Sequence, residues 1–306
     1  MTFPKDLLSI ADLNESQIND LLELAGTLKA SRFDPSHPKP LTGKSIGILT
    51  SKPSLRTRLS FEVGLMELGA HSVFIKNDEV GLGQRESYND VARVISRYFA
   101  AFIVRTHEHN GLLELAKHAS IPIINALSDS EHPCQILADF LTIKERFGRL
   151  KGVKLCYVGD GNNVAVSLML GSAITGIEFC LITPSGYEPP KAQVDRASSL
   201  AKKNASPLPN ITNDLNLAST ADILYTDVWI SMGQDNSRER IKKDFDPYQI
   251  NRQVSGNGRI PILHCLPAHR GEEITDEAFE DNANLIFDQA ENRLHAQKAL
   301  LLKILT

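Results

Sequence analysis

The order of hydrophobic and polar residues along the chain predicts strands that alternate with helices. Short apolar runs bounded by polar or glycine residues are typical of buried strands, whereas apolar residues three or four positions apart indicate one face of a helix. Runs of the first kind predict strands at 45–50, 71–75, 101–104, 121–125, 153–158, 178–182, 222–226, 260–264 and 285–287. Helical spacing predicts helices that include 18–28 and 61–68, and others at 87–98, 112–117, 134–147, 164–173, 190–203 and 291–305.

Local signals between these elements support the assignment. Asn14-Glu-Ser-Gln17 resembles a capping box, in which two side chains satisfy free backbone N–H groups at a helix start. The segments 34–40 and 78–85 are predicted loops, because the first is rich in proline and the second contains glycines among polar residues. Strands that alternate with helices imply an α/β fold with doubly wound parallel sheets.

The length of 306 residues suggests two domains, at about 150 residues each. The segment Gly148-Arg-Leu-Lys-Gly152 is the best candidate boundary, because it combines glycine and charged residues between a predicted helix and a predicted strand. We therefore expect a first domain at 1–148 and a second at 149–288.

Composition and charge narrow the class of protein. The hydrophobic content of 42% and charged content of 23% are ordinary for a soluble globular protein. A net charge of −4 gives no general attraction to nucleic acid or to anionic membranes, so neither partner is expected. The chain start does not resemble a signal peptide, and no apolar run is long enough to span a bilayer.

The four cysteines are scattered and lack CxxC spacing. This argues against a structural zinc site or a disulfide framework, and it fits a reducing, cytoplasmic location. The residues are Cys134, Cys156, Cys180 and Cys265.

The stretch that follows the first predicted strand is unusually basic for a helix start. Arg56 and Arg58 fall in the opening turn, where free N–H groups and the helix dipole favour acidic residues. Together with the hydroxyls of Ser54 and Thr57, they predict an anion site that suits a phosphate, although a solvated basic turn is the alternative.

Other polar residues also come directly after predicted strands. Ligands of doubly wound sheets bind beyond the carboxyl ends of the strands, so these residues are expected to meet in a cleft between the two domains. They are Ser54–Arg58, Arg105, His132–Gln135, Asn163, Asp227–Met232 and Cys265–Leu266.

Four motifs in order resemble the carbamoyltransferases, and the last two resemble the ornithine branch. The resemblance covers nearly the whole chain. The motifs are Ser54-Leu-Arg-Thr-Arg58, His132-Pro-Cys-Gln135, Asp227-Val-Trp-Ile-Ser-Met-Gly233 and His264-Cys-Leu-Pro267. The resemblance implies transfer of a carbamoyl group from carbamoyl phosphate to L-ornithine, giving L-citrulline and phosphate. It also implies a homotrimer or a multiple of trimers, no metal or organic cofactor, and a C-terminal helix, 289–306, that packs back on the first domain.

The resemblance assigns a first set of residues to carbamoyl phosphate. Ser54, Leu55, Arg56, Thr57 and Arg105 would hold the phosphate end, and His132 and Gln135 the carbamoyl end. Arg293 would reach the carbamoyl group or the phosphate, and Arg56 or Arg105 would share the carbonyl oxygen. His132, Arg105 and Cys265 are expected to be catalytic, the first two because donors aimed at the carbonyl oxygen stabilise the charge that develops during attack. On position alone, the alternative for Arg105 is a surface arginine at a strand end, and a lone histidine before proline, such as His132, is more often a cap or loop residue.

A second set is assigned to ornithine. Asn163 would bind the α-carboxylate, and Asp227 the α-ammonium, with Ser231 and Met232 completing the contact. Cys265 and the Leu266 carbonyl would contact the δ-amine and the carbamoyl group. A covalent cysteine mechanism is rejected, since the family reaction is direct attack by an amine. That amine must lose its proton first, which predicts a basic pH optimum.

One position departs from the family pattern. Many relatives carry a glutamine or histidine, in the loop before Glu86, that reaches a neighbouring subunit. Gly81 occupies that position here, so either Gln84 or Arg85 would replace the contact or the contact would be missing.

Three other functions are alternatives. Carbamoyltransferases for putrescine, N-acetylornithine or aspartate are the nearest, and Cys265 with the 227–233 loop favours ornithine over them. A nicotinamide dehydrogenase has only the incomplete Gly159-x-Gly161 pattern in its favour, with Val164 where a third glycine belongs. A non-catalytic paralogue is disfavoured by the complete motif set.

Overall fold

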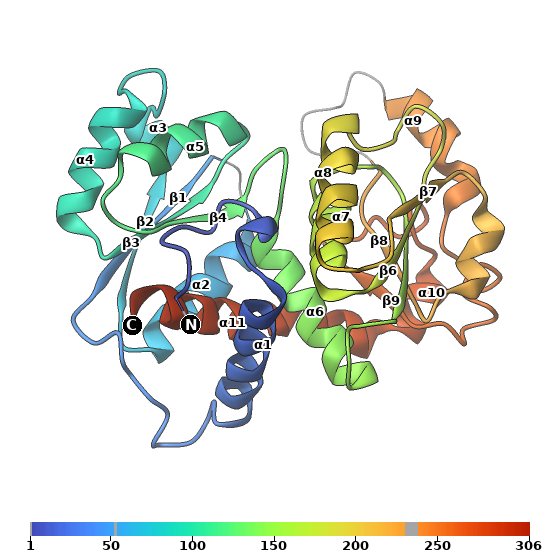
Figure 1. Ribbon diagram of the computed structural model, residues 1–306, viewed down its shortest axis with the longest axis horizontal. Coiled ribbons are helices and arrows are strands. Elements are labelled where there is room, and N and C mark those ends of the chain that lie inside the picture. The colour runs from blue at the N-terminus through green and yellow to red at the C-terminus, as the bar shows by residue number, and fades with distance from the viewer. Residues whose placement is uncertain (1, 52–53, 230–237) are drawn as a thin grey trace. The chain divides into compact units, whose positions relative to one another are not determined.

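The chain folds into two α/β units, each built around a parallel sheet (Figure 1). The structure is a computed structural model, and it describes residues 2–51, 54–229 and 238–306. Unit 1 comprises Met1–Leu141 and Glu291–Thr306, and unit 2 comprises Thr142–Ala290. The predicted α/β class with doubly wound parallel sheets is confirmed.

The sheet of unit 1 has the strand order β2-β1-β3-β4 among the described residues, and all its pairs are parallel. The inner strands are apolar because both faces are covered. The strands are β1 (Ser45–Thr50), β2 (His71–Lys76), β3 (Ala101–Arg105) and β4 (Ile123–Leu127).

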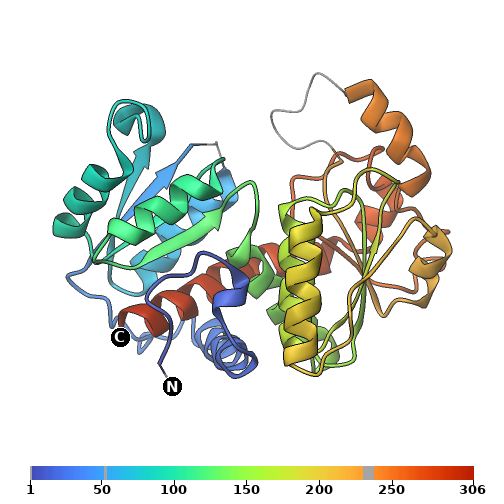
Figure 2. The ribbon, with the colours of Figure 1, turned by 45° about the horizontal axis from the view of Figure 1, so that its top comes forward.

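Helices pack on this sheet through the apolar faces that the sequence predicts. On one face, α4 and α5 share a hydrophobic cluster with the strands, and the two helices lie side by side in Figures 1 and 2. Val94 of α4 is an exception to this apolar face, since 48% of it is exposed. The helices of unit 1 are α1 (Glu15–Ala30), α2 (Leu55–Glu67), α3 (Asn77–Val80), α4 (Tyr88–Tyr98) and α5 (His109–His118), with a 3-10 turn η1 (Ile10–Asp12).

The sheet of unit 2 has the order β7-β6-β5-β8-β9 in the described part of the chain, again with parallel pairs. The edge strand β7 was not predicted, because it is short and polar. The strands are β5 (Lys154–Val158), β6 (Glu178–Ile182), β7 (Asn210–Thr212), β8 (Ile223–Thr226) and β9 (Ile262–His264).

In unit 2, α7 and α8 lie side by side (Figure 2). α7 is apolar around its whole circumference and almost entirely buried, whereas α8 is amphipathic and largely exposed. The helical elements are α7 (Asn163–Thr175), α8 (Lys191–Lys203), η2 (Leu215–Thr220), α9 (Arg238–Phe245), η4 (Asp246–Tyr248) and α10 (Asp276–Asp281).

Two long helices contribute residues to both units. α6 (Pro133–Phe147) begins in unit 1 and ends in unit 2, and α11 (Ala283–Leu305) begins in unit 2 and ends in unit 1.

The predicted strand at 285–287 is wrong, because these residues lie in the second turn of α11. Ile286 and Gln289 are buried while Phe287 is exposed, which is the spacing of a helix face and not of a strand. As a result, Arg293 lies three turns into the helix and not at its start. The predicted loop at 78–85 is also partly wrong, since α3 occupies its first residues.

The capping box at Asn14 is confirmed. The Asn14 side chain accepts from Gln17 N–H, and the Gln17 side chain accepts from Asn14 N–H, both at 2.9 Å. Among the described residues, no helix is both long and apolar enough to cross a membrane.

Candidate active site

The strand order of each sheet reverses beside its first strand. In unit 1 the chain passes from β1 to β2 on one side and to β3 and β4 on the other, so the reversal lies between β1 and β3. In unit 2 it lies between β5 and β8. Side chains at the carboxyl ends of these four strands are where a ligand of a doubly wound sheet binds. Of the predicted site residues, Ser54–Thr57 follow β1, Arg105 ends β3, and Asn163 and Asp227 follow β5 and β8.

In unit 1, the segment after β1 forms the capped start of α2. Ser54 is the N-cap, and its Oγ accepts a hydrogen bond from Thr57 N–H at 3.3 Å. The Ser54 hydroxyl also lies 3.0 Å from Thr57 Oγ1. The described first turn of α2 has no acidic residue, so its N–H groups and dipole remain available to an external anion.

Two buried guanidinium groups converge on the hydroxyl of Thr57. Arg105, at the end of β3, places Nη1 at 3.4 Å from Thr57 Oγ1, and Arg293 of α11 places Nη2 at 3.2 Å. The exposed fractions are 8% for Arg105 and 3% for Arg293. Guanidinium groups that converge at the start of a helix are an arrangement that binds phosphate. This favours the prediction of a phosphate site over a solvated basic turn.

Arg58 has a different environment from its neighbours in the motif. It is exposed, forms an ion pair with Glu62 at 3.1 Å and stacks on the ring of Phe74. Leu55 is 69% exposed, so only its backbone is suited to a role at the helix start, and Arg56 is half-buried.

The start of α6 adds a histidine and a glutamine to this cluster. Arg293 Nη1 donates to Gln135 Oε1 and lies 3.4 Å from His132 Nε2. Gln135 Nε2 in turn donates to Asp139 Oδ1 at 2.8 Å, which fixes the orientation of the Gln135 amide. Asp139 was not predicted, because it lies one helical turn beyond the motif.

His132 is held in its neutral form. Burial lowers the pKa of His132 well below 6.5, and the positive charges of three arginines lower it further. A neutral ring that accepts from Arg293 at Nε2 carries its proton on Nδ1. His132 can therefore donate one hydrogen bond, but it cannot serve as a cationic acid. The three arginines are Arg293, Arg105 and Arg56.

In unit 2, the loop after β5 is built around Asn162. This residue is the N-cap of α7, and its Oδ1 accepts from Val164 N–H at 2.9 Å and from Ala165 N–H at 3.1 Å. Asn163 is the first residue of the helix and is half-buried. The N-terminal end of α7 thus presents the Asn163 amide together with a positive dipole end, which suits a carboxylate.

The glycine pattern of this loop has a packing explanation. A Cβ on Gly161 would stand 2.4 Å from Pro189 N and 2.6 Å from Tyr187 O, so only glycine fits there. The close approach is to the chain's own backbone, and this removes the remaining support for a dinucleotide loop.

Asp227, directly after β8, is fixed by two hydrogen bonds. Its Oδ2 accepts from Asn162 Nδ2 at 3.1 Å, and its Oδ1 accepts from the N–H of Val228 at 2.8 Å. The hydroxyl of Tyr157 donates to Asn162 Oδ1 at 3.3 Å, and the Tyr157 ring stacks on Tyr225 of β8. The carboxylate is therefore oriented by both strands at the reversal point.

A second carboxyl group lies near Asp227. Burial and, to a lesser extent, the negative charge of Asp227 raise the pKa of Asp160 to about 7. Asp160 therefore exchanges a proton near neutral pH, and it does so close to the Asp227 carboxyl group.

β9 ends in a buried histidine with both ring nitrogens engaged. His264 Nε2 lies 3.0 Å from Glu273 Oε1, and His264 Nδ1 accepts from Leu266 N–H at 2.9 Å. Leu266 has a positive φ of 60°, which non-glycine residues rarely adopt, and this hydrogen bond holds it there. The histidine thus positions the backbone of the residue after Cys265.

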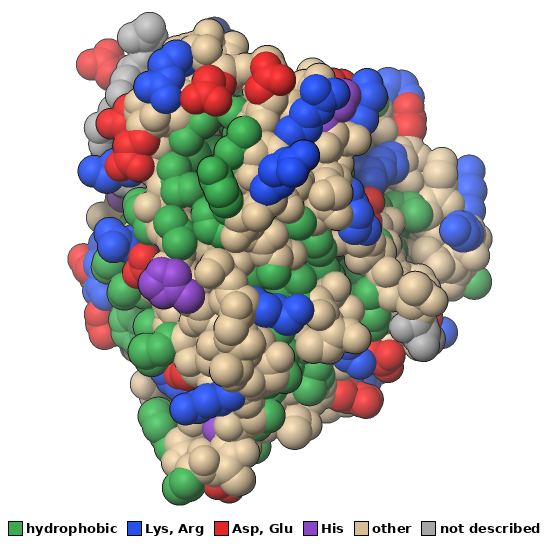
Figure 3. Space-filling view, turned by 90° about the vertical axis from the view of Figure 1, so that its left-hand side faces the viewer, with side chains coloured by type: hydrophobic (Ala, Val, Ile, Leu, Met, Phe, Trp, Pro, Cys, Tyr) green, Lys and Arg blue, Asp and Glu red, His purple; other side chains and the backbone are tan. Residues whose placement is uncertain are grey.

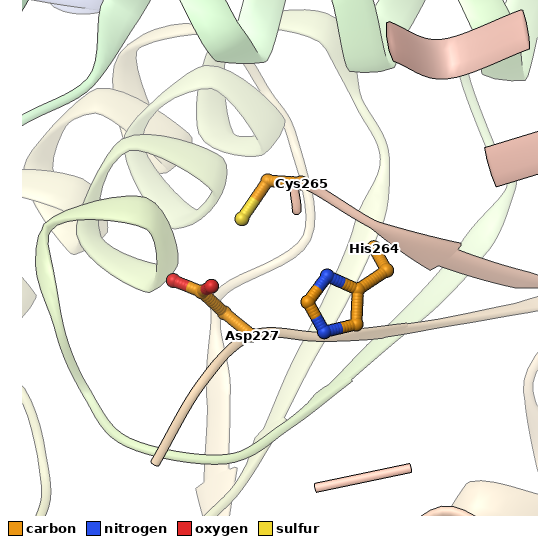
Figure 4. Close-up of side chains that lie close together, drawn as sticks. All are labelled: Asp227, His264 and Cys265. Atoms are coloured by element: carbon orange, nitrogen blue, oxygen red, sulfur yellow. The ribbon is translucent and has the colours of Figure 1, made fainter. Parts of the chain in front are cut away.

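Cys265 lies beside Asp227 and His264 (Figure 4). One potential ligand atom from each lies within 4.8 Å of the others, so the trio has the spacing of a metal site. However, both nitrogens of His264 already have hydrogen-bond partners, so a metal would have to break one of these bonds. The described residues His269, Glu272 and Glu273 form a second such group nearby.

Comparison with known proteins gives the family. Residues 5–145 match the model of the aspartate/ornithine carbamoyltransferase carbamoyl-P binding domain, and residues 151–304 match that of the Asp/Orn binding domain. The chain belongs to the aspartate/ornithine carbamoyltransferase family.

Relatives are similar over their whole length. An ornithine carbamoyltransferase from Methanocorpusculum labreanum is 46% identical, with 99% of this chain and 98% of the relative covered. A catabolic ornithine carbamoyltransferase from Thermoplasma volcanium is 44% identical, with 99% of each covered. The solved ornithine carbamoyltransferase from Pyrococcus furiosus is 40% identical, with a TM-score of 0.94 over 100% of this chain and 98% of that one.

Two residues predicted from the family motif lie outside the described residues. These are Ser231 and Met232, in the segment 230–237.

Gly81 has a structural reason to lack a side chain. It ends α3 with a positive φ of 64°, and its carbonyl accepts from Gln84 N–H and Arg85 N–H. A Cβ would meet the Cβ of Arg85 at 2.7 Å. A residue with a side chain at this position would require a different turn.

Sequence reasoning missed several residues of the site, and one of them had a usable signal. Asn is a preferred N-cap, so the first asparagine of the Asn162-Asn163 pair could have been assigned to the helix start. Tyr157, Asp160 and Glu273 had no local signal, because their place in the site follows from tertiary contacts.

Proposed function

We propose that this chain catalyses the transfer of a carbamoyl group from carbamoyl phosphate to the δ-amine of L-ornithine, giving L-citrulline and phosphate. The observation that carries the proposal is the convergence of buried Arg105 and Arg293 on Thr57 beside neutral His132. Full-length relatives that are named ornithine carbamoyltransferase support the choice of substrates.

The phosphate end of carbamoyl phosphate is assigned to the start of α2 and its arginines. The hydroxyls of Ser54 and Thr57 and the N–H groups near Leu55 supply neutral donors. Guanidinium groups bind phosphate oxygens through paired, charge-assisted hydrogen bonds, which stabilise the leaving group as the bond to the carbonyl carbon breaks. These groups belong to Arg56, Arg105 and Arg293.

The carbamoyl end is assigned to His132 and Gln135, with Arg105 shared between the two ends. A donor on the carbonyl oxygen stabilises the tetrahedral intermediate, and loss of one such donor typically costs about 3 kcal/mol in the barrier. The Nδ1–H of neutral His132 supplies this donor without adding charge. The amide of Gln135 is pre-oriented by Asp139 and Arg293, which lowers the reorganisation needed for binding.

Ornithine is assigned to the residues at the reversal point of unit 2. Asn163 at the start of α7 would bind the α-carboxylate, and Asp227 the α-ammonium. Ser231 and Met232 complete this contact in the proposal. Cys265 and the carbonyl of Leu266 would face the δ-amine.

The chemical step is direct attack. The neutral δ-amine forms the C–N bond, the bond between the carbonyl carbon and the phosphate oxygen breaks, and the amine releases a proton. Carboxyl groups favour removal of that proton, since Asp227 lies beside Cys265 and Asp160 lies near Asp227. A rate that rises from about pH 7 to about pH 9 is expected, since free alkyl amines have pKa values near 10. A flat profile would count against this step.

Assembly into a homotrimer, or a multiple of trimers, is part of the proposal. Unit 1 exposes large apolar side chains, and Figure 3 shows hydrophobic side chains gathered with Lys and Arg on one face. Exposed apolar patches mark interaction surfaces. Among the described residues of unit 1, those side chains include Leu55, Leu59, Met66, Val94 and Tyr98.

We also propose the domain assignment and the cellular role. Residues 1–148 with 289–306 form the carbamoyl-phosphate domain, and 149–288 form the ornithine domain. No metal or organic cofactor takes part, and the enzyme acts in the cytoplasm. A biosynthetic role is proposed because transfer from a mixed anhydride to an amine is downhill, so the synthetic direction needs no coupling. Rescue of an arginine auxotroph tests this role.

A panel of amine acceptors tests the reaction. The enzyme is incubated with carbamoyl phosphate and ornithine, putrescine, N-acetylornithine or aspartate, and the ureido product is measured. Ornithine is expected to give the highest kcat/KM. Preference for another acceptor would overturn the substrate assignment, and no turnover of any acceptor would overturn the activity. As a site test, Arg56→Gly is expected to abolish carbamoyl-phosphate binding while the fold remains intact.

A further inference from the structure

Two cysteines outside the candidate site lie next to each other in the sheet of unit 2. Cys156 of β5 is in register with Cys180 of β6, and Cys180 is in register with Asn210 of β7. Residues in register on neighbouring parallel strands project from the same face of a sheet. The three side chains therefore form a row across the sheet, away from the strand ends where the proposed reaction takes place.

Hydrogen bonds make the two thiols unequal. Asn210 Nδ2 donates to Cys180 Sγ at 3.6 Å, and the Cys156 thiol donates to the same sulfur. These bonds lower the pKa of Cys180, with the one from Cys156 contributing most. The same bond and burial raise the pKa of Cys156. A larger fraction of Cys180 than of Cys156 is therefore ionised to the thiolate, which is the reactive form.

Solvent exposure also favours Cys180 over Cys156 as the reactive thiol. Cys180 is partly exposed, whereas Cys156 is only 4% exposed and lies under η2, with its Sγ 3.8 Å from Leu217 O. A reactive, accessible thiol next to a buried thiol is the arrangement of an oxidation-sensitive pair. Neighbouring strands are about 4.7–4.9 Å apart, within the Cα separation of about 4.4–6.8 Å that a disulfide requires.

We propose that Cys180 and Cys156 form a redox pair that hydroperoxides oxidise to a disulfide, with Cys180 as the attacking thiol and Cys156 as the resolving thiol. The Cys180 thiolate attacks one peroxide oxygen, the O–O bond breaks, and the released oxygen takes a proton from solvent. Cys180 becomes a sulfenic acid. The Cys156 sulfur then attacks the Cys180 sulfur, the S–S bond forms, and the S–O bond breaks. The proton of Cys156 leaves with the hydroxyl as water, and the peroxide has accepted two electrons.

Mass spectrometry after treatment with hydrogen peroxide tests this directly. Residues 155–191 form one tryptic peptide that contains Cys156 and Cys180 and neither of the other cysteines. The expected product is a 155–191 peptide two hydrogens lighter than the dithiol form, which iodoacetamide labels only after reduction with dithiothreitol. Double labelling without reduction, at a peroxide dose that oxidises glutathione in the same tube, would overturn the proposal.

Variants assign the roles of the two thiols. In Cys156→Ser, dimedone is expected to trap a sulfenic acid at Cys180, whereas in Cys180→Ser the peptide should stay unoxidised. Trapping at Cys156 in the Cys180→Ser variant would reverse the roles and contradict the proposal. Asn210→Ala should slow the oxidation of Cys180, and an unchanged rate would remove the amide from the mechanism.

Cys134 is the internal reference for a buried thiol. Burial raises its pKa to about 12, so its peptide should be oxidised more slowly than Cys180, on the order of tenfold or more. Equal rates at the two sites would mean that the environment of Cys180 confers no reactivity. The wild-type experiment needs no variant, so it decides the outcome even where a variant fails to fold.

Discussion

Asn162 donates a hydrogen bond from Nδ2 to Asp227 Oδ2 over 3.1 Å, and so joins the loop after β5 to the end of β8. The opposite end of the same amide caps α7 through Oδ1. One side chain thus fixes the start of a buried helix and the orientation of a carboxylate. Because an amide has a donor end and an acceptor end, these two roles can be separated by mutation.

Asn162→Asp is expected to raise the KM for ornithine by about tenfold, which corresponds to the loss of one hydrogen bond to a charged group. The variant keeps an oxygen that caps α7, so any loss of stability should come from repulsion between its carboxylate and that of Asp227 and should shrink at low pH. Asn162→Ala should lose the cap as well, at about 1 kcal/mol of unfolding free energy. Steady-state kinetics and urea denaturation measure the two effects.

Asn14→Ala is the matched control for that pair. Asn14 caps α1 through the same kind of bond, at 2.9 Å to Gln17 N–H. Its loss should cost about 1 kcal/mol of stability without a change in KM. An unchanged KM in Asn162→Asp would show that Asp227 holds its orientation without the amide.

Arg293→Gln is expected to weaken phosphate binding by about 3 kcal/mol, a factor of roughly 100, because a buried charge-assisted donor is lost. Arg58→Gln should change it little, since Arg58 is exposed and paired with Glu62. Titration with inorganic phosphate, followed by calorimetry, compares the two. Similar losses in both variants would point to general electrostatics and not to a specific contact at Thr57.

The carboxyl of Asp160 should make stability depend on pH in a defined window. Its pKa is about 7 in the folded protein and near 3.8 when exposed, so between these values the folded state holds a proton that the unfolded state has lost. The unfolding free energy contributed by this group therefore falls as the pH rises from about 4 to about 7, and is constant above that.

Asp160→Asn removes this contribution. Urea denaturation between pH 4 and pH 8 measures the unfolding free energy of both proteins. As the pH rises from about 4 to about 7, the wild type should lose stability relative to the variant. A difference that is independent of pH would mean that Asp160 is ionised in the folded state throughout.

The Lys298–Glu67 ion pair in unit 1 should contribute strongly to stability. Its Nζ–Oε2 distance is 2.6 Å, and the Lys298 side chain is fully buried. Lys298→Met is expected to cost about 3 kcal/mol of unfolding free energy, since it leaves a largely buried carboxylate with a single remaining cation, Arg32.

Lys191 and Asp195 supply a control with the same separation. Their ion pair is also 2.6 Å long, but the exposed fractions of the two side chains are 85% and 62%. Lys191→Met should change stability by less than about 0.5 kcal/mol, because solvent screens the pair. Urea denaturation of both variants tests whether burial, and not distance, sets the energy. Equal losses of unfolding free energy in the two variants would show that burial does not set the energy of the ion pair.

The sequence alone determined the local features of this protein. Apolar runs and helical spacing predicted most strands and helices, because both signals depend on residues a few positions apart. The capping box at Asn14 and the basic start of α2 were predicted for the same reason. The polar residues after the strands could be named as a set, since parallel strands present their carboxyl ends at one edge.

The tertiary structure decided which of these residues meet. Arg293 contacts Thr57 across a separation of 236 residues, and the predicted strand at 285–287 became part of the helix that brings Arg293 there. The choice of Asn162 as helix cap and the shifted pKa of Asp160 depend on the packing of β5 beside β8. Strand order, burial and long-range hydrogen bonds set these contacts, and none of them leaves a periodic trace in the sequence.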